Sequence, residues 1–206
     1  MITPKQSATG ARAPWGALMS KPFVAKNMTK EIPYVFTKEN RKEFISESRR
    51  GSEDEKFQKQ YILNYLGLDI GSSTHYRCNT QTGEIKRLTR VMHLDDCHRW
   101  TEDFDGQVQD DNTLWTLKMI PEAGGAQNRA LREVFHLIEA CAKNVIFKQS
   151  NNNFVFVLDG EEILKYKDKM INLVPEKIRH RFIIGPVREV VETYEEKKQA
   201  WTILHN

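Results

Sequence analysis

The fold of this 206-residue chain is decided by residues 113–158, TLWTLKMIPEAGGAQNRALREVFHLIEACAKNVIFKQSNNNFVFVL. The segment begins with an apolar run at 113–120 and ends with a second one at 153–158, and both have the length of a β-strand. Between them, apolar residues recur at the spacing that places them on one face of a helix: Ala130, Val134, Leu137, Ile138 and Cys141. The pattern therefore predicts a strand, a helix over about 126–143 and another strand.

The sequence before this segment predicts two helices and then a series of strands. A helix over about 53–66 can be capped by Ser52, has an acidic first turn and ends at Gly67. A shorter helical pattern begins at Thr37. Extended segments separated by turn residues then predict strands at 75–79, 84–94 and 100–106. We expect the region 82–120 to form an antiparallel meander.

The sequence after this segment continues with helix and strand in alternation. It predicts a short helix at 161–170, a strand at 181–185 and a helix at 186–199. Strands in a row followed by strand–helix alternation imply a mixed sheet with helices on both faces. We therefore assign the chain to the α/β class, with an α+β mixed sheet flanked by helices.

The composition is that of a soluble globular protein, with 39% hydrophobic and 29% charged residues. No apolar run approaches the roughly 20 residues that cross a bilayer, and the first residues lack the apolar core of a secretory signal. The three cysteines, Cys78, Cys97 and Cys141, are scattered, which argues against a disulfide framework and fits a reducing compartment. We expect a cytoplasmic (intracellular) protein with no membrane association.

The charge is unevenly distributed along the chain. The net charge is +3, but residues 1–50 hold ten Lys or Arg against four Glu, so they carry +6 and the remainder carries −3. We divide the chain into a basic, partly flexible N-terminal arm at 1–36 and a domain at 37–206. A basic arm ahead of a mildly acidic body suits a polyanion partner, and a solvated arm without a partner is the alternative.

Acidic residues and one lysine lie on two consecutive predicted strands. Glu102, Asp103 and Asp105 stand at the end of the first strand, and Lys118 lies inside the apolar run of the next. Side chains alternate along a strand, so Thr116 and Lys118 share a face. Neighbouring carboxylates favour a divalent cation, and a lysine beside them stays charged and can position an attacking water. These are the groups that hydrolysis of a phosphodiester needs.

Three short motifs, in this order, resemble those of the PD-(D/E)xK nuclease superfamily, and within it the type II restriction endonucleases. EDFDG at 102–106 matches the position of the PD element, and TLK at 116–118 matches the (D/E)xK element. GGAQNRALRE at 124–133 opens the helix that follows. The resemblance covers about residues 50–160 and implies an αβββαβ core. It also implies a Mg²⁺-dependent endonuclease that hydrolyses the phosphodiester bonds of double-stranded DNA as a homodimer.

The sequence departs from the family at one position, because Thr116 stands where the second carboxylate would be. Some family members draw that acid from the next helix, which leaves three candidates here. Glu133 lies at the edge of the apolar helix face, Glu122 lies in the loop after the strand, and Glu139 projects nearly opposite the core. We favour Glu133 over Glu122, and a domain that has lost its activity is the alternative.

The resemblance also implies the roles of single residues. The catalytic candidates are Asp105, Lys118 and Glu133, and the candidate Mg²⁺ ligands are Asp105, Asp103, Glu133 and Glu122. Asp105 is our first choice because it precedes a glycine at the strand end, and Lys118 would orient the water and stabilise the charge of the transition state. Glu53 or Glu55 resembles a helical acid that some members add, and either can instead be a partner of the helix dipole.

The start of the helix at about 126–143 offers an anion site. Glycines precede it and its free N–H groups point outward, which allows close approach by a phosphate. The DNA-binding candidates are Gln127, Arg129 and Arg132. A solvated arginine face behind a Gly-Gly loop is the alternative.

The remaining motifs do not predict a metal or cofactor site. The segment 93–98 holds five possible zinc ligands, but a closed zinc site needs a second, separate ligand pair and none is apparent, so we expect a polar loop. Asp159-Gly160 reads as a turn at the end of a strand rather than as a metal site. The sequence has no GxGxxG, Walker, GxSxG or HExxH motif, so we expect no organic cofactor.

Two further functions stay open at this point. The same fold can serve as a catalytically inactive nucleic-acid-binding module, with Thr116 marking the lost acid. A nuclease that acts on RNA or on branched DNA is the other alternative.

Overall fold

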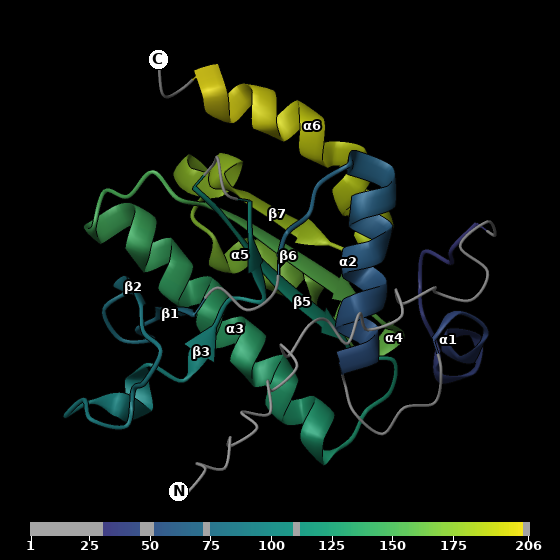
Figure 1. Ribbon diagram of the computed structural model, residues 1–206, viewed down its shortest axis with the longest axis horizontal. Helices are drawn as coiled ribbons and strands as arrows, with labels where there is room; N and C mark the ends of the chain where they lie inside the picture. Colours follow the sequence, from purple (N-terminus) through teal and green to yellow (C-terminus); the bar gives the residue numbers. More distant parts are fainter. Residues whose placement is uncertain (1–30, 46–51, 72–74, 109–111, 204–206) are drawn as a thin grey trace, which may run out of the picture.

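The computed structural model describes residues 31–45, 52–71, 75–108 and 112–203. These residues form a mixed α/β structure with two open sheets flanked by helices (Figure 1). The helices are α1 (Lys38–Phe44), α2 (Ser52–Leu66), α3 (Gly125–Phe147), α4 (Glu161–Leu164), α5 (Lys167–Leu173) and α6 (Val187–Ile203), with 3₁₀ turns η1 (Cys97–Arg99) and η2 (Glu176–Arg181). The strands are β1 (Tyr76–Cys78), β2 (Ile85–Arg87), β3 (Glu102–Asp103), β4 (Gly106–Gln107), β5 (Thr113–Met119), β6 (Asn153–Asp159) and β7 (Phe182–Gly185).

The larger sheet is mixed and has the strand order β4-β5-β6-β7. Strand β4 pairs with β5 antiparallel, whereas β5, β6 and β7 run parallel to one another. Helix α3 connects β5 to β6, and α4 and α5 connect β6 to β7. The elements predicted at 113–120, 126–143 and 153–158 are therefore confirmed as β5, α3 and β6, and the predicted mixed sheet with flanking helices is confirmed with them.

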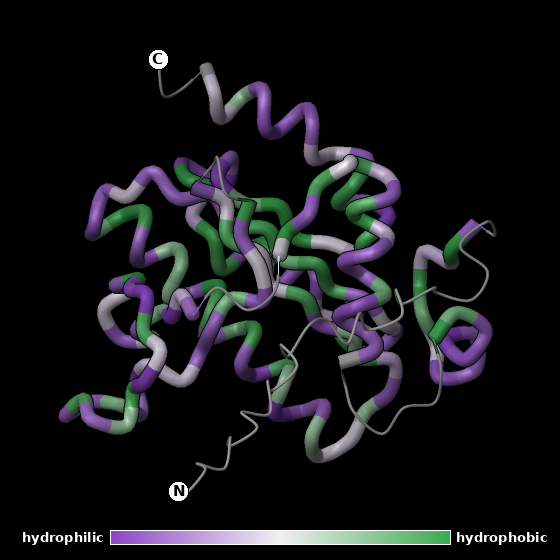
Figure 2. Tube along the Cα trace, viewed as in Figure 1, coloured by the Kyte–Doolittle hydropathy of each residue, from purple (hydrophilic) through white to green (hydrophobic). Residues whose placement is uncertain are grey.

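The side chains of the larger sheet alternate between two apolar cores, because successive residues of a strand point to opposite faces. On one face, Leu114 of β5 and Phe154 of β6 pack with buried residues of α3 and α5. On the other face, Trp115 and Val155 pack with buried residues of α2 and α6. The sheet is thus a middle layer between two helical layers, and Figure 2 shows hydrophobic strands inside and more hydrophilic helix surfaces outside.

The smaller sheet is antiparallel, has the order β2-β1-β3 and lies beside α3 (Figure 1). Gly83, in the turn between β1 and β2, packs on the backbone of α3 with a φ of +70°, and a Cβ at this position would lie 2.6 Å from the backbone nitrogen of Asn144. The Asn144 side chain also holds the turn, because its Nδ2 donates to the Gly83 carbonyl at 2.8 Å. The smaller sheet is therefore fixed on the helix that follows β5.

The predicted meander over 82–120 is wrong, because the chain changes sheets at Phe104. The N–H of Phe104 donates to a carbonyl of β1 at 3.1 Å, whereas the next N–H, that of Asp105, donates to a carbonyl of β5 at 2.9 Å. The Phe104 ring is buried and stacks on Phe154 of the larger sheet. Burial of this ring anchors the point at which the chain leaves one sheet for the other.

Several predicted elements are shorter than expected or divided. The predicted strand at 100–106 divides into β3 and β4, and of the predicted strand at 84–94 only β2 forms, since the rest is loop and turn. The predicted helix at 161–170 divides into α4 and α5. The helix predicted over 53–66 is confirmed as α2, and Thr37 caps α1 in a capping box.

The described part of the predicted arm, residues 31–36, packs on the rest of the protein. Ile32 and Phe36 are buried, and the Phe36 ring lies edge-on to the rings of Phe44 in α1 and Phe57 in α2. Residues 1–30, which hold every Lys and Arg of the predicted arm, lie outside the described residues.

None of the helices in the described part of the chain combines the length and the apolar character that a membrane crossing requires.

Candidate active site

Asp105 and Lys118 lie together where the chain enters the larger sheet. The N–H of Leu117 donates to Asp105 Oδ2 at 2.8 Å, and Lys118 Nζ lies 3.9 Å from the same oxygen. The antiparallel pairing of β4 with β5 causes this arrangement, because it sets residue 105 beside the strand that carries the lysine. The side chain of Asp105 is 17% exposed and that of Lys118 is 33% exposed, so solvent reaches both. The structure therefore brings together the two residues on which the predicted chemistry depends.

Burial raises the pKa of the Asp105 carboxyl above its ordinary value. The Lys118 ammonium group and the Leu117 N–H lower this pKa again, since both stabilise the ionised carboxylate, and the negative charges of Glu55 and Asp103 raise it. Without Lys118, the burial penalty would lose its largest opposing contribution. The lysine thus helps to keep a mostly buried carboxylate ionised.

Helix α2 contacts the Asp105 segment through Lys59. The Lys59 Nζ donates to the backbone carbonyl of Asp105 at 2.7 Å and forms an ion pair with Glu55 at 2.8 Å. Glu53, by contrast, pairs with Lys56 at 3.1 Å. Of the two helical acids that the sequence singled out, Glu55 is therefore the one whose charge acts on Asp105.

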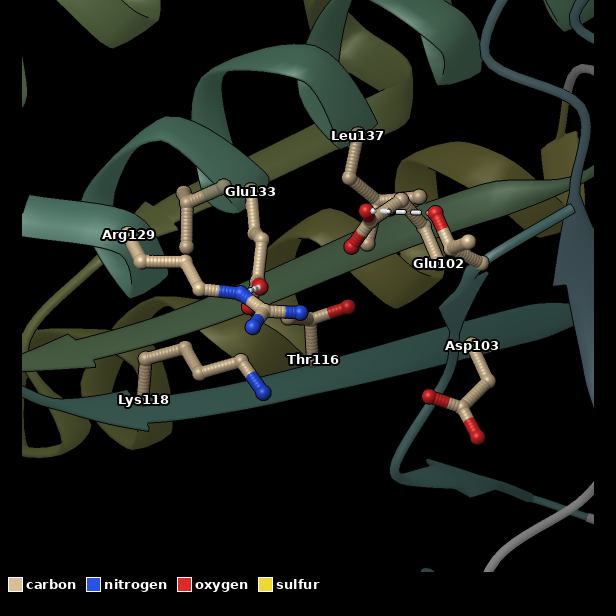
Figure 3. Close-up of a pocket in the computed structure, with 9 residues that line it drawn as sticks. Glu102, Asp103, Thr116, Lys118, Arg129, Glu133 and Leu137 are labelled. Atoms are coloured by element: carbon tan, nitrogen blue, oxygen red, sulfur yellow. Dashed lines mark hydrogen bonds and ion pairs between the residues drawn. The ribbon is translucent and has the colours of Figure 1, made fainter. Parts of the chain in front are cut away.

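A pocket of about 100 Å³ opens beside Lys118, between β3, β5 and the first half of α3. Its polar lining residues are Thr101, Glu102, Asp103, Thr116, Lys118, Arg129 and Glu133. Figure 3 shows Thr116 and Lys118 on β5, Arg129 and Glu133 reaching down from α3, and Glu102 and Asp103 on the opposite side. Acidic and basic side chains from three separate elements thus line one pocket.

Glu102 lines this pocket although it is not one of the predicted site residues. Burial raises the pKa of the Glu102 carboxyl, and a hydrogen bond from the Thr101 hydroxyl at 3.0 Å lowers it. The charge of Glu133 raises this pKa further, whereas that of Lys118 lowers it. These effects indicate that the Glu102 carboxyl lies within electrostatic reach of both β5 and α3.

The sequence pattern misses Glu102 because it treats 100–106 as one strand. On one strand, Asp103 and Asp105 share a face and Glu102 points away from them. The change of sheets at Phe104 separates Asp105 from β3. Glu102 and Asp103 line the pocket, and Asp105 is not among its lining residues. The aromatic residue between the acidic pair Glu102-Asp103 and Asp105 is the sequence signal for the break.

The other predicted metal ligands each pair with a cation: Asp103 with Arg77 at 3.3 Å, Glu133 with Arg129 at 2.8 Å and Glu122 with Lys38 at 2.8 Å. Asp103 and Glu133 line the pocket, and Glu122 is not among its lining residues. Within the described ranges, no three His, Cys, Asp or Glu side chains lie close enough to hold a metal ion. The structure therefore brings two of these three acids to the pocket and leaves Glu122 apart from it.

The three predicted DNA-binding residues take different positions at the start of α3. Gln127 folds back over Gly124, where its Oε1 would lie 2.5 Å from an added Cβ. Arg129 overhangs the pocket with a side chain that is 79% exposed. Arg132 is exposed and is not among the residues that line the pocket. Of the three predicted DNA-binding residues, Arg129 is thus the one that lines the pocket.

Asp159, at the end of β6, has a structural role. It is buried and accepts hydrogen bonds from Gln58 Nε2 at 2.6 Å and from the N–H of Val187 at 3.1 Å. Burial raises the pKa of the Asp159 carboxyl to about 6, against the two hydrogen bonds, which lower it. The residue therefore ties α2 and the start of α6 to the sheet, and the predicted strand-ending turn is confirmed.

The loop at 93–98 consists of turns and the beginning of η1, as the predicted polar loop requires. Asp96 organises it by accepting hydrogen bonds from Trp100 Nε1 at 3.2 Å and from Asn79 Nδ2 at 3.3 Å. The side chains of His93 and His98 are exposed.

Comparisons of the chain with protein-family models, with curated proteins and with solved structures found no match. Inferences about its function therefore rest on the fold and on the geometry of this site.

Proposed function

We propose that the chain is a Mg²⁺-dependent endonuclease of the PD-(D/E)xK type that hydrolyses DNA phosphodiester bonds, most similar to the type II restriction endonucleases. The observation that carries the proposal is the pair of Asp105, directly before β4, and Lys118, on β5, whose charged groups lie 3.9 Å apart. A carboxylate and an amine in this relation supply a cation ligand and a group that stabilises developing negative charge. The pocket beside them adds further acids.

The order of the elements supports the proposal. Helix α2 precedes the strands of the smaller sheet and the antiparallel pair β4 and β5, and α3 then leads to β6, parallel to β5. Five strands in two sheets lie between α2 and α3, where the αβββαβ order has three strands. The part of that order that supports the proposal is the antiparallel pair β4 and β5, followed by α3 and by β6 parallel to β5. The carboxylate and the lysine fall at the two positions of that order where the family motifs stand, at residues 105 and 118.

The oxygen donors at the site fit Mg²⁺, which usually takes one or two protein carboxylates and completes its coordination with water and substrate phosphates. Asp105 would hold the ion together with a second acid from the pocket. Mg²⁺ bound there would supply Lewis-acid polarisation of the scissile phosphate.

Lys118 has two functions in this proposal. It helps to keep Asp105 ionised against the cost of burial, and its ammonium group can hydrogen-bond the attacking water and stabilise negative charge on the phosphate. Arg129, at the rim of the pocket, can turn towards a DNA phosphate because most of its side chain is exposed.

The proposed substrate is double-stranded DNA. The basic residues of the segment 1–36 would add contacts to the phosphate backbone, with an affinity that falls as salt rises. Cleavage of both strands at a palindromic site calls for a two-fold homodimer, which we include in the proposal.

Thr116 favours a second candidate function. It stands where the family has its second acid, and a hydroxyl group cannot replace a carboxylate as a charged ligand. If no other acid takes that role, the protein binds nucleic acid without cutting it. The second candidate is therefore a catalytically inactive nucleic-acid-binding module of the same fold.

Cleavage of plasmid DNA by the purified protein tests the proposal, with Mg²⁺ in one reaction and EDTA in another. The variants are Lys118→Ala and, as the control, Lys165→Ala, which removes an exposed lysine paired with Glu162 at 2.8 Å. We expect cleavage only in Mg²⁺, its loss in Lys118→Ala and its retention in Lys165→Ala. Wild-type cleavage no faster than that of Lys118→Ala would overturn the proposal.

The same preparations separate the alternatives. Retardation of DNA in EDTA, without cleavage at any Mg²⁺ concentration, would favour the inactive module. A substrate panel with RNA and branched DNA identifies the nucleic acid that is cut fastest, for which we expect duplex DNA.

A further inference from the structure

The hydroxyl group of Thr116 is the feature of the pocket that the proposed function leaves unused. The residue is 1% exposed, and its Oγ1 is buried without a hydrogen-bond partner in the described structure. Thr116 also lines the pocket, on the face of β5 that carries Lys118 (Figure 3). A buried hydroxyl without a partner is unfavourable, so it marks a place where a ligand or a ligand-bound water belongs.

The carboxylates of Glu102 and Glu133 stand on two walls of the same pocket. Glu102 comes from β3 and Glu133 from α3, and the negative charge of Glu133 raises the pKa of Glu102. In the described residues, Glu102 forms no ion pair, and its hydrogen-bond donor is the hydroxyl of Thr101. The pocket thus contains a carboxylate that no cation neutralises by direct contact.

The cations of the pocket leave room for a metal ion. Lys118 is directed to Asp105, at 3.9 Å. Arg129 holds Glu133 through an ion pair one helical turn away, and its side chain is 79% exposed. Surface pairs of this kind contribute little to stability, so Glu133 can exchange the guanidinium group for a metal ion at small cost.

We infer that Glu102, Glu133 and the Thr116 hydroxyl form a divalent-cation site. Carboxylate and hydroxyl oxygens are the donors that Mg²⁺ and Mn²⁺ accept, and a volume of about 100 Å³ holds an ion with a few of its waters. This inference deepens the proposed function, and it rests on that function only for the use of the ion in cleavage.

Binding of Mn²⁺ alone, measured by the electron paramagnetic resonance signal of the free ion, tests the site without any nuclease assay. The variants are Glu102→Gln, Glu133→Gln and Thr116→Val, which keep the size of each side chain and remove its charge or its hydroxyl. Glu139→Gln is the control, because it removes an exposed acid from the same helix. Thermal unfolding checks that every variant folds.

Loss of an outer-shell partner already costs a metal site roughly 10–100-fold in affinity, so loss of a ligand should cost at least about tenfold. We expect that weakening for Glu102→Gln and for Glu133→Gln, a smaller one for Thr116→Val and none for Glu139→Gln. Wild-type affinity in folded Glu102→Gln and Glu133→Gln, or no Mn²⁺ binding by the wild type, would overturn the inference.

The two proposals fail in different ways. Mn²⁺ binding that depends on Glu102 and Glu133, without cleavage of any nucleic acid, would support the cation site and refute the nuclease. Cleavage of DNA that depends on Lys118, with Mn²⁺ affinity unchanged in Glu102→Gln and Glu133→Gln, would support the nuclease and refute this site.

Discussion

Replacement of Asp159 with Asn should change how the stability of the fold depends on pH. The Asp159 carboxyl is buried at the end of β6, and its pKa is raised to about 6, against about 3.9 in an unfolded chain. The folded protein therefore keeps this proton over a pH range in which the unfolded chain has already released it.

The direction of the effect follows from this difference. Because the folded-state pKa is the higher one, protonation of Asp159 stabilises the folded state, fully below about pH 4 and no longer above about pH 6. A difference of about two pKa units corresponds to about 3 kcal/mol. The wild type should therefore lose about 3 kcal/mol of unfolding free energy through this group between about pH 4 and pH 7.

The Asn side chain fits the same surroundings without titrating. Its Oδ1 can accept from the N–H of Val187, and its Nδ2 can donate to Gln58 Oε1, which is buried without a partner in the described structure. Urea unfolding at several pH values between about 4 and 7 measures the difference between wild type and Asp159→Asn. The variant should gain about 3 kcal/mol relative to the wild type across this range, whereas Asp95→Asn, at an exposed residue, should follow the wild type. Parallel curves for wild type and Asp159→Asn would refute the reasoning.

Three further predictions concern the smaller sheet, the junction of the sheets and the pocket rim. Gly83→Ala should cost at least about 3 kcal/mol in thermal unfolding, because the added Cβ would combine a strained φ with a contact of 2.6 Å to the nitrogen of Asn144. The control Gly71→Ala, with a φ of +68° and open space around it, should cost about 1 kcal/mol, and equal costs for the two variants would contradict the packing of Gly83 on α3. Phe104→Ala should cost about 3–5 kcal/mol in urea unfolding, as for other fully buried aromatic residues, and a cost below about 1 kcal/mol would show that its ring does not hold the two sheets together. Arg129→Ala should weaken DNA retardation in EDTA and reduce the slope of log affinity against log salt by about 1, and an unchanged slope would remove this residue from the DNA contacts.

The parts of the fold that the sequence predicts well are those with a long, regular hydrophobic pattern. The segment 113–158 gives β5, α3 and β6 because both faces of these strands are buried and one stripe of the helix is apolar. Helix α2 is predicted equally well, since its acidic first turn and Gly67 mark its ends. A local sequence pattern is enough to predict a helix or strand when its buried residues recur with the period of that element.

The smaller sheet could not be predicted in the same way. Its strands have only two or three residues, and their pairing is set by contacts distant in sequence, such as the packing of Gly83 on α3. The change of sheets at Phe104 depends on a ring that stacks on Phe154, 50 positions later, and nothing near residue 104 specifies that partner. The error about the meander has this cause.

The candidate site, like the fold, could be predicted only in part from the sequence. The pair of Asp105 and Lys118 follows from strand order and alternation, and the structure brings these residues together. The surroundings of the pair depend on tertiary contacts: Glu122 pairs with Lys38, and Glu102 reaches the pocket from another sheet. Sequence patterns place residues along an element, but they do not rank several acids at the junction of three elements.

The central claim is that Asp105 and Lys118 act as one unit in phosphodiester hydrolysis. Single-turnover cleavage of duplex DNA in Mg²⁺ by the wild type, Asp105→Asn, Lys118→Ala and the double variant tests it most directly. Each single substitution should slow cleavage by about 10²–10⁴-fold, and the double variant should be no slower than the slower single variant, because groups that act together are not additive. Losses that multiply in the double variant, or cleavage by either single variant at the wild-type rate, would contradict the claim.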